Sequence, residues 1–187
     1  MNKDVEMRRQ VFHAVIGSIA IAVFLYAGRT NAMLFTGIIF LIGCLISLLI
    51  MREAKLPIIS SALKYFGREN EKHLPGKGAL MFALGLFLLL MLFQRTEIII
   101  GAMVVAVYGD AASTFAGKSI GRIRIWQEYT LEGTLGGIAV SALLLMFLFP
   151  VYVAIAGAVV GMLAELLPID DNISIPLVAA TAITLLF

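Results

Sequence analysis

Seven long apolar segments dominate this 187-residue chain and constrain its fold more than any other feature. A helix needs about 20 mostly apolar residues to cross a bilayer, with a range of roughly 17 to 25. We therefore predict a single all-α domain over residues 1–187, a polytopic transmembrane bundle of about seven spans. Because the third, fifth and seventh segments are short, six spans with one re-entrant segment is the competing prediction. The segments run approximately 11–28, 32–51, 79–94, 98–116, 134–149, 151–167 and 173–187.

The composition agrees with a membrane protein. Hydrophobic residues make up 61% of the chain, against the roughly 45–50% that is usual in soluble domains. Charged residues make up only 14%, so most of the surface must face something other than water. The single cysteine, Cys44, lies in an apolar segment and cannot form an intrachain disulfide. The sequence has no basic tail or long Lys/Arg run, which argues against nucleic acid as a partner.

The Lys and Arg residues orient the bundle, because cytoplasmic loops of membrane proteins carry an excess of both. With the N-terminus in the cytoplasm, only Arg29 and Arg95 lie outside. The first apolar segment is then a retained span. Within 52–78, apolar residues at helical spacing after Pro57 predict either a short amphipathic helix in the interface or a loop packed on the bundle. The inner segments are 1–10, 52–78, 117–133 and 168–172.

Asp110 is the most informative residue. It lies roughly six residues inside the inner end of its predicted helix, which places it about 9 Å deep. A carboxylate at that depth costs a few kcal/mol unless it is paired, hydrated or bound to a metal. Ser113, Thr114 and Gly117 share its helical face. We predict a functional role for Asp110, with a structural ion pair to an Arg of a neighbouring helix as the alternative.

A glycine-rich basic stretch follows Asp110. The helix is predicted to end near Gly117 and to continue as a loop with Lys118, Gly121 and Arg122. Glycines let a backbone approach an anion closely and point N–H groups at it, and both basic side chains can bind phosphate. The spacing is not that of a P-loop. The stretch therefore predicts a phosphate-binding loop, with an ordinary positively charged inner loop as the alternative.

Two further carboxylates fall at the inner ends of later helices. Glu132 opens the fifth predicted helix, where an acid in the first turn also favours the helix dipole. Glu165 shares a helical face with Gly157 and Gly161, and small residues at that spacing allow close helix packing. We therefore expect Glu165 to point into the bundle rather than into lipid.

The last helix begins with Asp170, Asp171 and Asn172. These side chains offer the hard oxygen ligands that Mg²⁺ takes in combination with substrate phosphates. The alternative is that Asp171 or Asn172 caps the helix. His13, with Gly17 on the same face of the first helix, is predicted either to bind phosphate or shuttle a proton, or to pack as a hydrogen-bonding residue.

Carboxylates, glycines and Lys/Arg on one membrane face suit Mg²⁺-assisted phosphoryl transfer, which relies on positioning and charge neutralisation. No Cys/His cluster is present, so zinc is not expected. Any chemistry should take place on the inner face.

In their order along the chain, these motifs resemble the membrane family of dolichol kinases, phytol kinases and fungal CTP-dependent diacylglycerol kinases. The resemblance covers nearly the whole chain and is strongest around Asp110. One departure is Tyr129, where the family usually has Lys. The matching elements are Arg8-Arg9-Gln10-Val11-Phe12-His13, Arg68-Glu69-Asn70-Glu71, Gly76-Lys77-Gly78, Gly109-Asp110-Ala111-Ala112 with Gly117-Lys118 and Gly121, Thr130-Leu131-Glu132-Gly133-Thr134, and Glu165 with Asp170-Asp171-Asn172 through Pro176-Leu177.

The resemblance implies transfer of the γ-phosphoryl group of CTP, or less readily ATP, to the hydroxyl of a membrane lipid alcohol such as a polyprenol, a dolichol or another isoprenoid alcohol. Mg²⁺ is the implied cofactor. Because the chain is short for a eukaryotic dolichol kinase, it looks like a minimal prokaryotic-type core in the cell membrane. The implied catalytic residues are Asp110, Glu132 and Asp171. The implied metal ligands are Asp110, Glu132, Glu165, Asp170 and Asp171. The implied nucleotide- and phosphate-binding residues are His13, Arg68, Lys77, Gly109, Ser113, Gly117, Lys118, Gly121, Arg122 and Asn172.

Two other functions are compatible with the sequence. A cytidylyltransferase that makes a CDP-lipid would retain the cytidine and release pyrophosphate. A small transporter or scaffold would also use intramembrane carboxylates, but transporters tend to bind substrate near the midplane and these acids cluster at one face. The sequence leaves the lipid alcohol and the oligomeric state open, since faces such as Gly133-x-x-x-Gly137 suit packing within one chain or between two.

Overall fold

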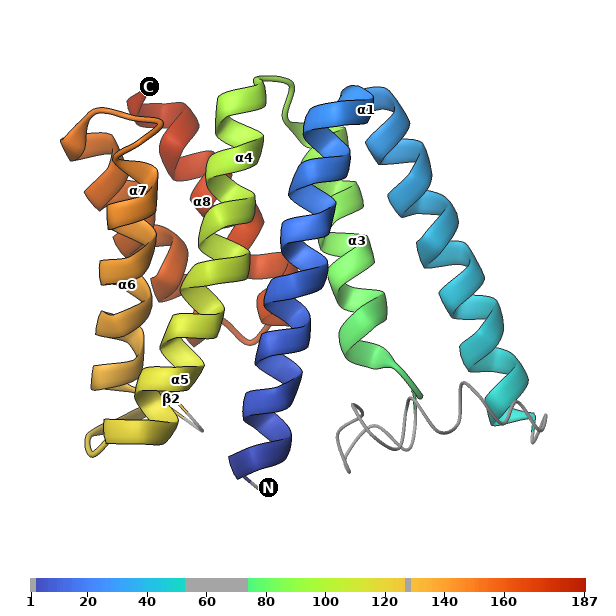
Figure 1. Ribbon diagram of the computed structural model, residues 1–187, viewed down its shortest axis with the longest axis horizontal. Helices are drawn as coiled ribbons and strands as arrows, with labels where there is room; N and C mark the ends of the chain where they lie inside the picture. The colour runs from blue at the N-terminus through green and yellow to red at the C-terminus, as the bar shows by residue number, and fades with distance from the viewer. Residues whose placement is uncertain (1–2, 53–73, 127–128) are drawn as a thin grey trace.

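The computed structural model describes residues 3–52, 74–126 and 129–187 and is almost entirely helical, as predicted. Successive helical rods alternate in direction, so that the N-terminus lies at the lower end of the bundle in Figure 1 and the C-terminus at the upper end. The elements are α1 (Lys3–Met51), α3 (Lys77–Leu92), α4 (Thr96–Val104), a π-helical turn η2 (Val105–Gly109), α5 (Asp110–Ile120), β1 (Arg124–Trp126), β2 (Tyr129–Thr130), α6 (Leu131–Leu145), α7 (Val151–Leu163), a 3₁₀ turn η3 (Ala164–Leu166) and α8 (Asp171–Leu186).

Helix α1 folds back on itself at Gly28, as the two blue limbs in Figure 1 show. Gly28 has φ 77° and ψ 170°, a backbone conformation that is essentially restricted to glycine. The chain before it (residues 3–27) is the first limb, and the chain after it (residues 29–51) is the second limb. The two apolar segments predicted in this region are therefore separate helices that meet at one glycine.

Replacing Gly28 with alanine is expected to lower the free energy of unfolding by about 1–3 kcal/mol. An added Cβ would meet no atom within 4 Å, so backbone strain is the only cost. Thermal unfolding of the detergent-solubilised protein checks this, with Gly37→Ala as a control at an ordinary helical glycine. Equal unfolding temperatures for the two variants would contradict the turn at Gly28.

Two described segments, Met7–Met51 and Thr96–Ile120, have the length and hydropathy that crossing a membrane requires. The other apolar helices, α3, α6, α7 and α8, contain 16, 15, 13 and 16 residues. At 1.5 Å per residue they span roughly 20–24 Å, which is less than the ~30 Å of a typical hydrocarbon core. A seven-span bundle therefore goes beyond what the helix lengths alone establish.

Close glycine contacts hold the rods together. An alanine Cβ at Gly133 or Gly137 would lie 2.8 Å from the carbonyl oxygens of Ser113 and Gly109, respectively. The Gly133-x-x-x-Gly137 face is therefore used within the chain, to bring α6 against η2 and α5. Gly161 packs against Ala179 in the same way, which joins α7 to α8.

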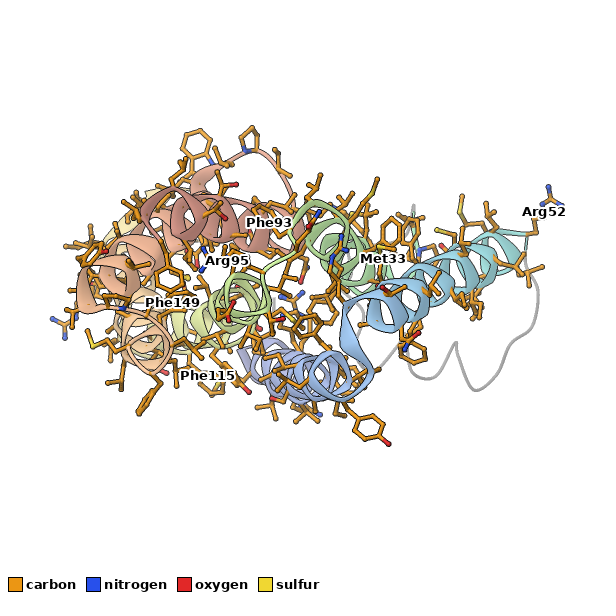
Figure 2. The ribbon with its side chains drawn as sticks, turned by 90° about the horizontal axis from the view of Figure 1, so that it is seen from above. Met33, Arg52, Phe93, Arg95, Phe115 and Phe149 are labelled. Carbon is orange, nitrogen blue, oxygen red and sulfur yellow. The ribbon has the colours of Figure 1, made fainter. Side chains whose placement is uncertain are left out.

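Arg29 and Arg95, the two basic residues predicted outside, both have partners at the upper end of the bundle. The Arg29 Nε donates to the carbonyl oxygens of Leu90 and Phe93 at 2.7 and 2.9 Å, which ties the α1 turn to the end of α3. The Arg95 guanidinium lies 4.6 Å from the ring centroid of Phe187. Figure 2, viewed from above, shows Arg95 among the rods, whereas the second limb projects away from them toward Arg52.

Candidate functional site

A cavity of about 1080 Å³ reaches the lower end of the bundle, where its lining includes Lys77, Lys118 and Asp170. Helices α3, α6 and α8 begin at this end, and α5 and η3 finish there, so charged residues far apart in the sequence meet in one place. We call this part of the cavity the polar end. Its polar and charged lining residues are Arg9, Gln10, His13, Lys77, Asp110, Ser113, Thr114, Lys118, Tyr129, Thr130, Glu165, Asp170, Asp171 and Asn172.

Asp110 and His13 mark the boundary between the polar end and an apolar continuation of the cavity. The two side chains interact electrostatically across it. Beyond them the lining is apolar, starting with Ile16 on the first limb and Met103 on α4. The exception is Thr36, whose hydroxyl donates to Ala32 of its own helix at 2.9 Å. A hydroxyl carried on an apolar chain would therefore meet Asp110 and His13 first.

The π-helical turn η2 sets the direction of Asp110. It lies immediately before Asp110 in the otherwise continuous helical stretch 96–120. A π-turn inserts an extra residue into an α-helix and rotates the residues that follow, and such turns are frequent at functional sites. Sequence periodicity placed Asp110 on one regular helix, so this turn is a feature that the sequence did not predict.

Asp170 caps α8 and pairs with Lys77. One of its carboxylate oxygens accepts from the backbone N–H and the side-chain amide of Asn172, at 3.3 and 3.0 Å. Its other oxygen lies 3.3 Å from Lys77 Nζ. The N-cap is therefore Asp170 rather than Asp171 or Asn172, because Asp170 alone has the extended backbone that precedes the first helical turn.

Asp171 is held by Tyr129. The Tyr129 hydroxyl donates to Oδ2 of Asp171 at 2.5 Å, across the gap between β2 and α8. Burial and the nearby charge of Asp171 raise the pKa of Tyr129 well above its ordinary value, so this hydroxyl stays protonated and remains a donor. Tyr129 is thus a neutral partner for the carboxylate.

Replacing Tyr129 with phenylalanine is expected to lower kcat of the reaction proposed below about 10- to 100-fold, as loss of a residue that orients a catalytic or metal-binding carboxylate does. The expected change in unfolding free energy is only about 1 kcal/mol, the worth of one hydrogen bond. Tyr108→Phe is the matched control, since it removes a hydroxyl bonded to Ser18 at 2.8 Å outside the cavity. An unchanged kcat in Tyr129→Phe would show that Asp171 needs no such support.

Glu165 is buried in the bundle, as its helical face predicted, with only 1% of its surface exposed. Its Oε2 accepts from the Thr134 hydroxyl at 3.4 Å, and its Oε1 has no hydrogen-bond partner among the described residues. Asp110 and Asp171 interact with it electrostatically. A buried carboxylate oxygen without a partner, beside two more acids and facing a cavity, is suited to binding a cation.

The predicted glycine-rich loop begins later than expected, at Gly121, which is the C-cap of α5 and has an extended backbone. Helix α5 continues to Ile120, so Gly117 and Lys118 lie in its last turn and the backbone N–H groups there bond within the helix. The Lys118 side chain lines the cavity, so its predicted role does not depend on a loop. Gly109 is buried, and a Cβ there would collide with Ser141, which makes it a helix-packing residue.

Glu132, Gly121 and Arg122 do not line the cavity. The Glu132 carboxylate accepts instead from the backbone N–H of Ile123, at 3.2 and 3.3 Å, which fixes the turn between α5 and β1. The predicted amphipathic segment within 52–78, together with Arg68, lies outside the described residues. Of the predicted site, the structure therefore brings together the acids of α5, η3 and α8 but not Glu132.

Sequence reasoning missed several residues of the site. Gln10 is 3% exposed and donates to the Thr114 hydroxyl at 2.8 Å, which joins the first limb to α5. Its position one helical turn before His13 was the available signal. Trp126 and Thr130 also line the cavity. No spacing rule reveals Gly85, which packs directly against the start of α8.

The donor set fits Mg²⁺ bound together with a nucleotide. Within the described residues, no three His, Cys, Asp or Glu side chains lie close enough to hold a metal ion alone. Mg²⁺ is usually held by one or two carboxylates, with water and phosphate oxygens completing its octahedron. The unpartnered oxygen of Glu165, together with the nearby Asp110 and Asp171, can supply these one or two carboxylate ligands.

Comparison with known proteins identifies a relative that aligns with this chain over nearly its whole length. The chain is 30% identical over 181 residues to a protein of Methanocaldococcus jannaschii named "Uncharacterized protein MJ1137", and the alignment covers 94% of this chain and 91% of the relative. No protein-family model matches the chain, and no solved structure matches it.

Proposed function

The chain belongs to the same family as the Methanocaldococcus jannaschii protein MJ1137, and we propose that it is a membrane lipid-alcohol kinase that uses CTP, or less readily ATP. The relative's name carries no activity, so the proposal rests on the site. The observation that carries it is the cavity itself. Its polar end presents Lys77, Lys118 and four carboxylates, and its other part is largely apolar. This arrangement matches a nucleoside triphosphate and an alcohol with a long apolar chain, which meet at Asp110.

The surface supports insertion of the whole bundle in a membrane. Large apolar side chains are also exposed outside the two longest segments: Leu143 is 61% exposed, Phe147 82% and Leu185 80%. Soluble proteins rarely tolerate large contiguous apolar surface. The turn at Gly28 also divides the Met7–Met51 segment into two rods. We therefore propose seven crossings, with α3, α6, α7 and α8 completed by flanking residues or by local thinning of the bilayer.

The proposed reaction takes place at the cytoplasmic end of the bundle in a prokaryotic cell membrane. The lipid hydroxyl oxygen forms a bond to the γ-phosphorus, and the bond from that phosphorus to the β–γ bridging oxygen breaks, so the nucleoside diphosphate leaves. Asp110 takes the hydroxyl proton, because it lies at the boundary where that hydroxyl would stand. Lys77 and Lys118 neutralise phosphate charge, and His13 orients the hydroxyl.

Asp171 and Glu165 are the residues proposed to hold Mg²⁺. When bound with the nucleotide, the ion supplies charge neutralisation on the β- and γ-phosphates. Tyr129 keeps the Asp171 carboxylate in place without adding positive charge, since its hydroxyl is neutral.

The decisive experiment offers purified protein γ-labelled CTP, ATP, GTP and UTP in turn, with Mg²⁺ and a panel of long-chain alcohols, and follows label into the lipid phase. Transfer from CTP to an alcohol, with CDP as co-product, is the expected result. No transfer from any donor by folded protein would overturn the kinase proposal. Release of pyrophosphate with α-labelled CTP and a phosphorylated lipid would instead identify a cytidylyltransferase, and flux without nucleotide turnover would identify a transporter.

A further inference from the structure

The two limbs of α1 are attached to different parts of the bundle. The first limb is tied to α5 by the hydrogen bond from Gln10 to Thr114, at 2.8 Å. The second limb packs on α3, since a Cβ at Gly43 would lie 2.7 Å from the Leu80 side chain. The limbs join at Gly28 and diverge toward the lower end of the bundle (Figure 1), and the second limb projects away from the other rods (Figure 2).

The cavity extends to the outside between these two limbs. Both limbs line it, together with α3. Ile19 on the first limb and Phe35 on the second limb are each 53% exposed, and Ile39 is 45% exposed. A side chain that lines a cavity and is also half exposed lies at an opening of that cavity. We call the opening defined by Ile19, Phe35 and Ile39 the lateral mouth. It is separate from the polar end.

The lateral mouth lies at the depth of the hydrocarbon layer in the proposed membrane arrangement. Ile19 is nine residues before Gly28 and Phe35 is seven residues after it, which places them roughly 14 and 10 Å from the turn along their helices. The hydrocarbon core is about 30 Å thick, so both positions fall well inside it. The three side chains of the mouth are apolar. An apolar chain of the surrounding bilayer therefore fits this opening, and water does not.

The mouth leads to the boundary between the apolar and polar parts of the cavity. His13 lies six residues before Ile19 on the first limb, which is roughly 9 Å farther from the turn. His13 interacts electrostatically with Asp110 at that boundary. A chain that enters sideways can therefore bring a polar head group to these two residues while the rest of the chain stays in the bilayer.

The energetics of this route favour recognition of the head group. Bilayer chains are as apolar as the side chains of the mouth, so moving part of a chain from the bilayer into the mouth changes the free energy little. A buried hydroxyl, by contrast, needs a hydrogen-bond partner, and His13 and Asp110 provide one. Affinity should therefore depend on the hydroxyl and not on the length of chain that remains outside.

We propose that the lateral mouth is the entrance by which a bilayer-resident alcohol reaches Asp110, with its chain held between the two limbs of α1 and continuing into the bilayer. The proposal rests on the proposed function for its catalytic meaning. Occupation of the mouth is a binding event, however, and can be tested without nucleotide.

The experiment uses single cysteines in a Cys44→Ser background, which removes the only native cysteine. Ile19→Cys and Phe35→Cys place a thiol at the mouth. Val15→Cys and Leu34→Cys are the matched controls, because these residues are 52% and 57% exposed on the same limbs and do not line the cavity. Each protein is placed in lipid nanodiscs, and its modification by a bilayer-dissolved N-alkyl maleimide is timed by mass spectrometry. The competitors are hexadecanol, a long polyprenol and hexadecane.

Hexadecanol at about ten times its apparent Kd is expected to slow modification of both mouth variants about tenfold and to leave both control variants unchanged. The polyprenol should protect with a similar apparent Kd, and hexadecane, which lacks the hydroxyl, should not protect. Equal protection of mouth and control variants, no protection of either, protection by hexadecane, or protection that is lost with the longer chain would overturn the proposal.

Label transfer from CTP to hexadecanol, measured before and after complete modification, separates this proposal from the kinase function. Modification of Ile19→Cys or Phe35→Cys is expected to abolish transfer, whereas modification of Val15→Cys or Leu34→Cys should leave it unchanged. Selective protection of the mouth variants without label transfer by any variant would overturn the kinase function alone. Undiminished transfer by fully modified mouth variants would overturn the lateral mouth alone.

Discussion

Asp110→Asn is expected to lower kcat for phosphoryl transfer about 100- to 10,000-fold, the contribution typical of a general base. The asparagine keeps the shape of the side chain but cannot accept the hydroxyl proton. The variant should fold at least as stably as wild type, because removing this charge relieves its repulsion with the buried Glu165. Loss of activity in a protein of undiminished stability therefore separates a catalytic Asp110 from a structural one. The measurement is γ-label transfer in parallel with thermal unfolding.

Two control variants make the Asp110 result specific. Glu97→Gln removes an exposed carboxylate at the opposite end of the bundle and should leave kcat unchanged. Glu132→Gln should reduce kcat less than about tenfold, since Glu132 bonds to the backbone of Ile123 outside the cavity. If Glu132→Gln instead abolished transfer while Asp110→Asn did not, the catalytic assignment would have to be exchanged between the two residues.

Among purely steric changes, Gly85→Ala is expected to cause the largest loss of activity and stability. An alanine Cβ at this position would collide with the carbonyl oxygen of Asn172, which is backbone and cannot move alone. The start of α8 must therefore shift. Asp170 and Asp171 lie at this start and line the cavity, so both side chains would be displaced. Overpacking of this kind typically costs about 1–3 kcal/mol of stability, and a shift of about 1 Å at a reacting group can cost on the order of 100-fold in rate.

Gly37→Ala is the matched control for Gly85→Ala. Its Cβ would approach only the ring of Phe87, at 3.2 Å, and that side chain can rotate away. Replacing a helical glycine with alanine also favours the helix by about 1 kcal/mol. The control should therefore keep wild-type activity and equal or greater stability. Wild-type activity and stability in Gly85→Ala would mean that α8 does not begin against α3.

Much of the site was predictable because a charged residue in an apolar segment has an energetic cost that can be recognised from the sequence. Asp110, Glu165 and Asp171 are carboxylates in or beside apolar segments, and a charge there is costly unless it is paired, hydrated or bound to a metal. The glycine spacing around Glu165 also predicted the side of the helix that faces the bundle. Gly117 misled for the opposite reason: glycine permits a loop but does not require one, and α5 continues through Gly117 to Ile120 before the chain leaves the helix at Gly121.

The sequence by itself determined that the chain is helical, where its apolar helices lie, and that acids and basic residues gather at one end, since hydropathy, helical period and charge bias are local properties of the chain. Only the tertiary structure decided the pairings: Tyr129 with Asp171, Lys77 with Asp170, and Glu132 away from the cavity. It also decided the π-helical turn that precedes Asp110 and which residues line the cavity. These features depend on how rods distant in sequence pack against one another, and no local pattern encodes the distance between two helices.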